Sequence, residues 1–149
     1  MKKVILLCIL CFAMSISSSF ACECDNACNE EQLDKKIYSG ANYTFFTAEI
    51  LAIESAFHLE VTVQINHIFY GAKFVKDSLK PVTIYFDLRT ECAIMDRGDI
   101  KAGSKLFITA AYNSMGKMFI TNHCDAFFPV ELIDTYNLRG YLEDLKDIQ

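Results

Sequence analysis

Residues 57–71, FHLEVTVQINHIFYG, alternate between apolar and polar side chains, and this pattern constrains the fold more than any other feature of the sequence. The apolar positions of the alternation are Phe57, Leu59, Val61, Val63 and Ile65. Because successive side chains of a strand point to opposite faces, a period of two indicates a strand with one buried face. The same parity predicts that His67 points inward and His58 outward, and Gly71 ends the strand.

Four further stretches favour strands because they are rich in β-branched and aromatic residues. They are residues 43–55, 81–88, 103–112 and 117–122. Pro81 stands at the start of its stretch, where a missing backbone N–H costs least. The sequence NSMG joins the last two stretches and predicts a tight hairpin.

Two segments outside these strands favour helix. Residues 29–41 are polar and predict a short helix or an irregular segment that ends at Gly40. Residues 129–148 predict a helix with Pro129 in its first turn, where proline is well tolerated. Its apolar face would carry Leu138, Leu142 and Leu145.

Five strands in succession followed by a helix cannot form a parallel sheet, because the crossover helices between strands are absent. A small closed barrel buries one face of every strand, and five strands is the number found in the oligonucleotide/oligosaccharide-binding (OB) fold. We therefore expect a mainly β chain that forms one domain, a five-stranded OB barrel with a C-terminal helix.

The first 21 residues have the layout of a secretory signal peptide. Lys2 and Lys3 precede an apolar run from Val4 to Met14, and small residues follow up to Ala21. The run is too short to span a bilayer, so no membrane span is expected. Cleavage after Ala21 would start the mature domain, residues 22–149, at Cys22. We expect a secreted, extracellular protein, or a periplasmic or surface-anchored one if the host is bacterial.

Charge and motifs exclude several function classes. The formal charge of −5, made more negative by loss of Lys2 and Lys3, argues against nucleic-acid binding, which needs a basic face. The sequence lacks HExxH, GxSxG and a phosphate-binding glycine loop, so we expect no enzyme. His123 and Cys124 could form a thiolate–imidazole pair, but a disulfide at Cys124 would leave His123 in solvent.

Cysteines are concentrated at the expected mature N-terminus. Five of the seven remain after cleavage, namely Cys22, Cys24, Cys28, Cys92 and Cys124. Export favours disulfides, and an odd number leaves one thiol over. A structural zinc site built from Cys22, Cys24, Cys28 and Cys124 is the alternative, although C-x-C-x3-C lacks the C-x2-C knuckle typical of such sites.

Several segments together resemble a known family. The chain has CEC at the expected cleavage point, then ANYTFFTAEILAI and VTVQINHIFYG, then TEC, and finally AGSKLFITAAYNSMGKMFITNHCD before the closing helix. This order resembles the tissue inhibitors of metalloproteinases, specifically their N-terminal netrin-like domain, which is an OB barrel. The likeness covers nearly the whole mature chain.

The resemblance implies two disulfides, Cys22–Cys92 and Cys24–Cys124. The family's third disulfide has no counterpart, because Ser39 stands near the first of its positions and the C-terminal segment has no cysteine. Cys28 matches no family position. No counterpart of the family's second domain is expected within these 149 residues, and Val130 stands where a tryptophan is expected.

The resemblance also implies a function, inhibition of zinc metalloendopeptidases. The α-amine and carbonyl oxygen of Cys22 would chelate the catalytic zinc of the target, and Glu23 would enter its specificity pocket, where the family usually has Ser or Thr. No cofactor of its own is expected, since the target supplies the zinc, and we expect a monomer. The target-binding ridge would comprise Cys22, Glu23, Cys24, Asp25, Thr90, Glu91, Cys92 and Ala93.

Two alternatives remain open at this point. The chain could be an exported netrin-like binding module that inhibits nothing, with its cysteines serving stability alone. It could also be a lipoprotein anchored at Cys22, in which case acylation would remove both the chelating amine and the Cys22–Cys92 bridge. Asn42 begins an N-glycosylation sequon that matters only in a eukaryotic host.

Overall fold

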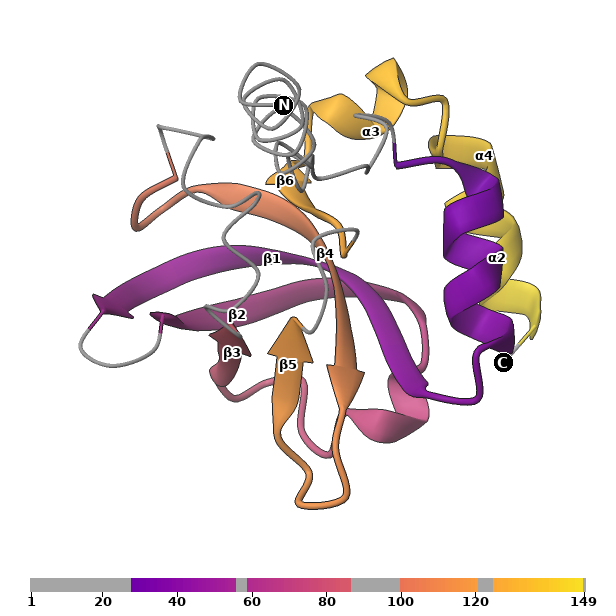
Figure 1. Ribbon diagram of the computed structural model, residues 1–149. Helices are drawn as coiled ribbons and strands as arrows, with labels where there is room; N and C mark the ends of the chain where they lie inside the picture. The colour runs from indigo at the N-terminus through magenta and orange to yellow at the C-terminus, as the bar shows by residue number, and fades with distance from the viewer. Residues whose placement is uncertain (1–27, 56–58, 87–99, 121–124, 149) are drawn as a thin grey trace, which may run out of the picture.

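The computed structural model describes residues 28–55, 59–86, 100–120 and 125–148 of the chain, and its centre is a β-barrel (Figure 1). The strands are β1 (Asn42–Ser55), β2 (Leu59–Tyr70), β3 (Val82–Phe86), β4 (Lys105–Tyr112), β5 (Met118–Ile120) and β6 (Phe127–Pro129). All five predicted strands are therefore present, and β6 is an addition.

The strand pairing is that of an OB barrel. β1, β2 and β3 form an antiparallel meander, β3 pairs in parallel with β5, and β5 pairs antiparallel with β4. β4 then pairs with β1 and closes the barrel, while β6 lies outside it on β4. The predicted mainly β, five-stranded OB barrel is confirmed.

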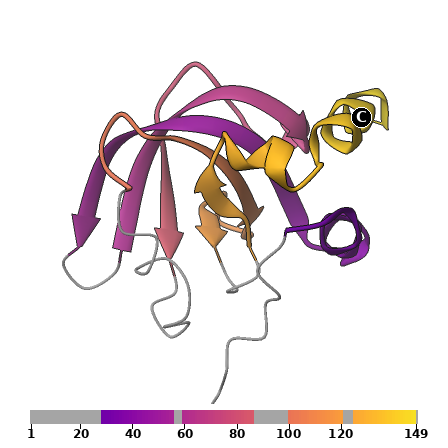
Figure 2. The ribbon, with the colours of Figure 1, turned by 90° about the horizontal axis from the view of Figure 1, so that it is seen from above.

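Helices cover one side of the barrel, where the helix of residues 30–38 lies beside the C-terminal helical segment (Figures 1 and 2). The helical segments are α2 (Glu30–Tyr38), α3 (Leu132–Thr135), α4 (Arg139–Asp144) and the 3₁₀ turns η1 (Ala72–Phe74) and η2 (Leu145–Ile148). Asn29 caps α2 by accepting a hydrogen bond from the backbone N–H of Gln32 at 2.9 Å. Of the two alternatives predicted for residues 29–41, a short helix or an irregular segment, the structure has the helix, which ends at Tyr38, before Gly40.

The apolar side chains form two clusters. One fills the barrel and includes Phe46, Ala48 and Ile50 of β1 together with Leu106, Ile108 and Ala110 of β4. The other lies between the outer face of the barrel and the helices, and it includes Tyr43, Phe45, Phe107, Phe128, Leu33 and Leu142. Alternate residues of β1 and of β4 therefore belong to different clusters.

The C-terminal segment differs from the continuous helix that the sequence predicts. Pro129 is the last residue of β6, an outer strand where a residue without an N–H can be accommodated, and not part of a helical turn. Asn137 has φ 55°, a left-handed conformation that separates α3 from α4. The predicted apolar face is nevertheless correct, because Leu138, Leu142 and Leu145 are all buried.

The predicted inward position of His67 is wrong, because a bulge interrupts the alternation of β2. Ile65 pairs with Ala48 and His67 pairs with Thr47, so Asn66 is an extra residue on β2. Val61, Val63 and Ile65 point into the barrel, whereas Asn66 and His67 are both exposed. The inward parity resumes one position later, where Ile68 packs against the barrel cluster.

Within the described part of the chain, no helix is long and apolar enough to cross a membrane.

A hydrogen bond joins the two helical segments. The hydroxyl of Tyr141 in α4 donates to Oδ1 of Asp34 in α2 at 2.5 Å. Burial of the phenol, followed by this carboxylate, raises the pKa of Tyr141. The folded protein therefore holds the tyrosine in its neutral form at a pH where the unfolded chain would ionise it.

This pKa shift predicts a loss of stability in alkali. In the unfolded chain the tyrosine has a pKa of about 10. Below that pH the hydrogen-bonded Tyr141 contributes its full stabilisation, and above it the unfolded chain loses a proton that the folded protein retains. We expect the free energy of unfolding to fall as pH rises above about 10, and Tyr141→Phe to make this fall less steep. At neutral pH the variant should lose about 1 kcal/mol with the hydrogen bond. Urea denaturation across pH measures both effects; an unchanged alkaline slope in the variant would contradict the assignment.

Candidate functional site

The residues predicted to bind a target lie outside the described part of the chain. They are Cys22, Glu23, Cys24, Asp25, Thr90, Glu91, Cys92 and Ala93, and the same holds for Cys124, the predicted partner of Cys24. The predicted disulfides and zinc-chelating terminus therefore stay predictions. The structure does describe the positions from which these segments leave the barrel.

β3 and β5 end side by side. These parallel strands pair Phe86 with Ile120, the last residue of each. The segment that leads to the TEC sequence (90–92) and the segment that leads to Cys124 thus start from neighbouring strand ends. The end of β1 lies at the same end of the barrel, since β1 and β3 are both antiparallel to β2.

β5 and β6 share one edge of β4. β1 pairs with β4 from Lys105 to Tyr112 and so occupies one edge along the whole strand. β5 pairs with Ala111 and Tyr112, and β6 pairs with Leu106 to Ile108, both on the remaining edge. In the sequence, Cys124 therefore belongs to the short connection between β5 and β6, which both pair with β4.

A buried ion pair fixes the residue that follows Cys124. Nζ of Lys36 in α2 lies 2.6 Å from Oδ1 of Asp125, and the two side chains are 7% and 0% exposed. The same ammonium lies 5.1 Å from the ring centroid of Tyr43, a cation–π contact. The pair ties α2, the first helix after the cysteine-rich N-terminus, to the segment beside Cys124.

Cys28, the cysteine that matches no family position, is at the start of the described chain. It is half-buried and packs against the cluster beneath the helices. Its position places it next to α2, which begins two residues later.

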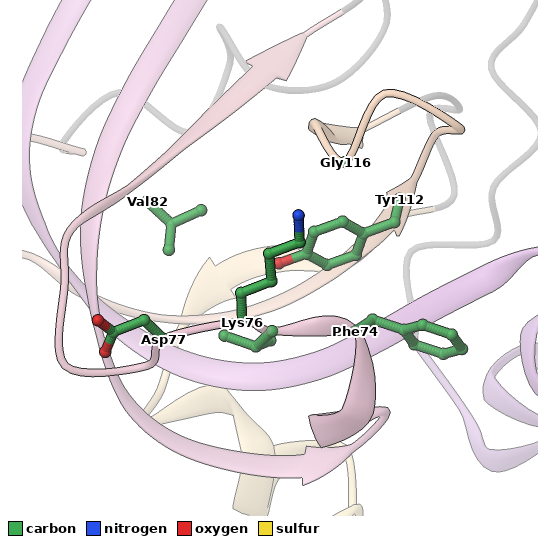
Figure 3. Close-up of a pocket in the computed structure, with 7 residues that line it drawn as sticks. Phe74, Lys76, Asp77, Val82, Tyr112 and Gly116 are labelled. Carbon is green, nitrogen blue, oxygen red and sulfur yellow. The ribbon is translucent and has the colours of Figure 1, made fainter.

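A pocket opens at the other end of the barrel, between the β2–β3 connection and the β4–β5 hairpin (Figure 3). Its volume is about 210 Å³, and it is lined by Phe74, Val75, Lys76, Asp77, Val82, Tyr112 and Gly116. The rings of Phe74 and Tyr112 lie 6.4 Å apart and form part of its apolar wall. Figure 3 shows Tyr112 extending toward the segment that carries Lys76, with Asp77 at the far rim.

The glycine that starts the β2–β3 connection is required by close backbone packing. Gly71 has φ 75°, and a Cβ at this position would lie 2.2 Å from the carbonyl oxygen of Tyr43. Its own carbonyl accepts a hydrogen bond from the hydroxyl of Thr44 at 3.1 Å. These contacts place η1, and with it Phe74, against the start of β1.

Partial burial raises the pKa of Tyr112. A tyrosine phenol is neutral at physiological pH, so Tyr112 can donate a hydrogen bond inside the pocket. The pocket is not evident from the sequence alone. In AKFVKDSLK (72–80) lysines are interspersed with apolar residues, which is a weak signal, but the pocket wall formed by Tyr112 depends on the tertiary fold.

Among the described residues, no three His, Cys, Asp or Glu side chains are close enough together to hold a metal ion. No protein-family model matches this chain, and no curated protein matches its sequence.

Proposed function

We propose that the protein is a secreted inhibitor of zinc metalloendopeptidases that uses its mature N-terminus as the zinc ligand. The sequence basis is its resemblance to the tissue inhibitors of metalloproteinases. The structural observation that carries the proposal is the adjacent ending of β3 and β5 at Phe86 and Ile120, on the OB barrel that this resemblance implies. Phe86 and Ile120 are the last described residues before the segments that contain Thr90 and Cys124.

The proposed inhibitory step is coordination of the target's zinc. An α-amino group has a pKa of about 7.7–8, so its neutral lone pair is accessible near physiological pH, and zinc lowers the pKa further. A catalytic zinc keeps one coordination position open for water or substrate. The amine and carbonyl oxygen of Cys22 would displace that water and leave the enzyme without its nucleophile.

Rigidity of the ridge would give the chelate its affinity. The proposed Cys22–Cys92 and Cys24–Cys124 bridges join the N-terminus to two segments that start at neighbouring strand ends. The Lys36–Asp125 pair supports the same arrangement, since it fixes the residue after Cys124 to α2. A ridge held in its bound conformation loses little conformational entropy on association. Asp25, Thr90, Glu91 and Ala93 would flank the chelating residue.

Glu23 would set the specificity of the inhibitor. A carboxylate that enters an apolar pocket pays a large desolvation cost unless a cation meets it. We therefore propose that the preferred target is a metalloendopeptidase with a basic specificity pocket, and that peptidases with apolar pockets bind weakly.

Blocking the N-terminus is the direct test. The protein that begins at Cys22 should inhibit a zinc endopeptidase with a basic pocket, and addition of one alanine before Cys22 should weaken inhibition at least tenfold. The added residue removes the α-amine from Cys22 and inserts atoms between the zinc and the ridge. Inhibition constants for the two forms, with intact masses that confirm each terminus and two disulfides, measure the effect.

Equal inhibition by both forms would exclude chelation by the terminus. A diacylglyceryl adduct in the mass of the exported protein would favour the lipoprotein alternative instead, and absence of inhibition by either form would favour a netrin-like binding module. Glu23→Thr is the matched specificity variant. It should improve inhibition of a peptidase with an apolar pocket, and no improvement would place Glu23 outside the specificity pocket.

A further inference from the structure

We propose that the end of the barrel that carries the pocket binds the surface of an anionic lipid bilayer. This face, here called the loop face, consists of residues 71–82 between β2 and β3 and residues 112–118 around the β4–β5 hairpin. It lies at the opposite end of the barrel from the strand ends Phe86 and Ile120. The inference does not depend on inhibition of a peptidase.

Two apolar side chains project from the loop face. Leu79 is 87% exposed and Met115 is 74% exposed, far more than the other exposed aliphatic residues of the described chain, Leu51 and Ile53. Each stands at the tip of one of the two connections. The pocket is lined by residues of both connections.

Hydrogen bonds within each turn hold the tips in place. The backbone N–H of Leu79 donates to Oδ1 of Asp77 at 3.1 Å, and Nε2 of Gln64 donates to the carbonyl of Ser78 at 3.1 Å. In the hairpin, Oδ1 of Asn113 accepts from the backbone N–H groups of both Met115 and Lys117 at 3.0 Å. Because the turns are already ordered, insertion of the tips would require little further ordering of the backbone.

The charge of the loop face is opposite to that of the whole chain. Its two connections contain four lysines and one acidic residue, whereas the full sequence has a formal charge of −5. The lysines are Lys73, Lys76, Lys80 and Lys117, all exposed. The acidic residue, Asp77, pairs with Lys80 at 3.1 Å. Positive charge around two projecting apolar residues is complementary to an anionic leaflet, which attracts basic segments close to its surface.

The shape of this face favours a bilayer over an acidic peptide. The exposed apolar groups project from the protein, so they can enter a lipid interface without a matching cavity in a partner. A peptide would need a groove, and the pocket of about 210 Å³ is large enough for little more than one side chain. The long stems of the lysines can also lie along the interface while their ammonium groups contact headgroups.

Vesicle co-sedimentation tests the proposal with the purified mature protein. Phosphatidylcholine vesicles are compared with vesicles in which a third of the lipid is phosphatidylglycerol. We expect binding to the anionic vesicles, weakened by added salt, and little binding to the neutral ones. Lys76→Gln with Lys117→Gln should weaken binding about 30-fold, since each lysine near an anionic surface contributes about 1 kcal/mol. Leu79→Ser with Met115→Ser should weaken it about tenfold.

Two double variants at the other end of the barrel are matched controls. Lys101→Gln with Lys105→Gln changes the net charge equally, and Leu51→Ser with Ile53→Ser removes apolar side chains of similar size that are partly exposed. Both should bind anionic vesicles as the parent protein does, and circular dichroism spectra should show that all four double variants are folded.

Equal binding to neutral and anionic vesicles, equal losses in the test and control variants, or no vesicle binding would each overturn the proposal. Poly-glutamate provides the competing outcome: binding to this polymer without binding to vesicles would assign the loop face to an acidic polypeptide instead of a membrane.

Discussion

Replacement of Lys36 by methionine is expected to lower the free energy of unfolding by about 3–5 kcal/mol. The substitution removes the cation 2.6 Å from the carboxylate of Asp125, whose side chain is fully buried. A buried charge that loses its ion-pair partner is far more costly than the pair itself is stabilising. The contact between the ammonium and the ring of Tyr43 is lost as well. Urea denaturation of the two proteins, followed by circular dichroism, measures the change.

The neighbouring residue in α2 provides the control. Lys35 forms an ion pair with Glu31 at 2.7 Å, but the two side chains are 70% and 76% exposed, so Lys35→Met should cost about 0.5 kcal/mol or less. Lys36→Met combined with Asp125→Leu should recover much of the loss, because it removes both buried charges together. Equal losses for Lys35→Met and Lys36→Met would show that the buried pair has no special role.

Gly71→Ala is expected to lower the free energy of unfolding by about 3 kcal/mol. A left-handed conformation costs a residue with a Cβ about 1–2 kcal/mol, and overpacking of a filled site adds about 1–3 kcal/mol. At Gly71 the new Cβ would lie 2.2 Å from the backbone oxygen of Tyr43 and 3.1 Å from Cα of Thr44. Relief of this clash requires the backbone of β1 or of the β2–β3 connection to shift.

Gly103→Ala separates the two contributions. Gly103 has a similar φ of 86°, but a Cβ there would meet nothing within 4 Å. Its substitution should therefore cost only the conformational penalty of about 1–2 kcal/mol. Denaturation curves of the two variants give the comparison. If both lose the same stability, steric contact with β1 is not what requires glycine at position 71.

Local patterns in the sequence predict most of the barrel. The alternation of residues 59–65 corresponds to the inward face of β2, and the NSMG turn joins β4 to β5 as expected. Leu138, Leu142 and Leu145 are buried even though the helix containing them is interrupted. The spacing of the apolar residues indicates which positions are buried. This prediction therefore holds even where the backbone of the helix is irregular.

The irregularities themselves depend on tertiary pairing. The extra residue Asn66 is fixed by how β2 pairs with β1, and no local signal marks a bulge there. Pro129 is equally compatible with the first turn of a helix and with an outer strand, and the available edge of β4 determines that it lies in β6. The left-handed Asn137 is a residue type that tolerates this conformation, but many asparagines do not adopt it.

The two candidate sites differ in how the sequence reveals them. The ridge from Cys22 to Asp25 was predicted from a motif and its family resemblance, and it lies outside the described residues. The pocket at the loop face was not predicted, because Phe74 and Tyr112 are far apart in the sequence and approach each other only when the barrel closes. A motif search finds the first kind of site, and the second requires the fold.

β1 and β4 each contribute side chains to both apolar clusters, and this determines how the protein unfolds. Phe45 packs beneath the helices and its neighbour Phe46 fills the barrel, so neither cluster can be disrupted without loss of order in a strand that the other requires. The helical layer is thus not a separate unit that could melt before the barrel. Heat should unfold both in a single cooperative transition, as is usual for small domains.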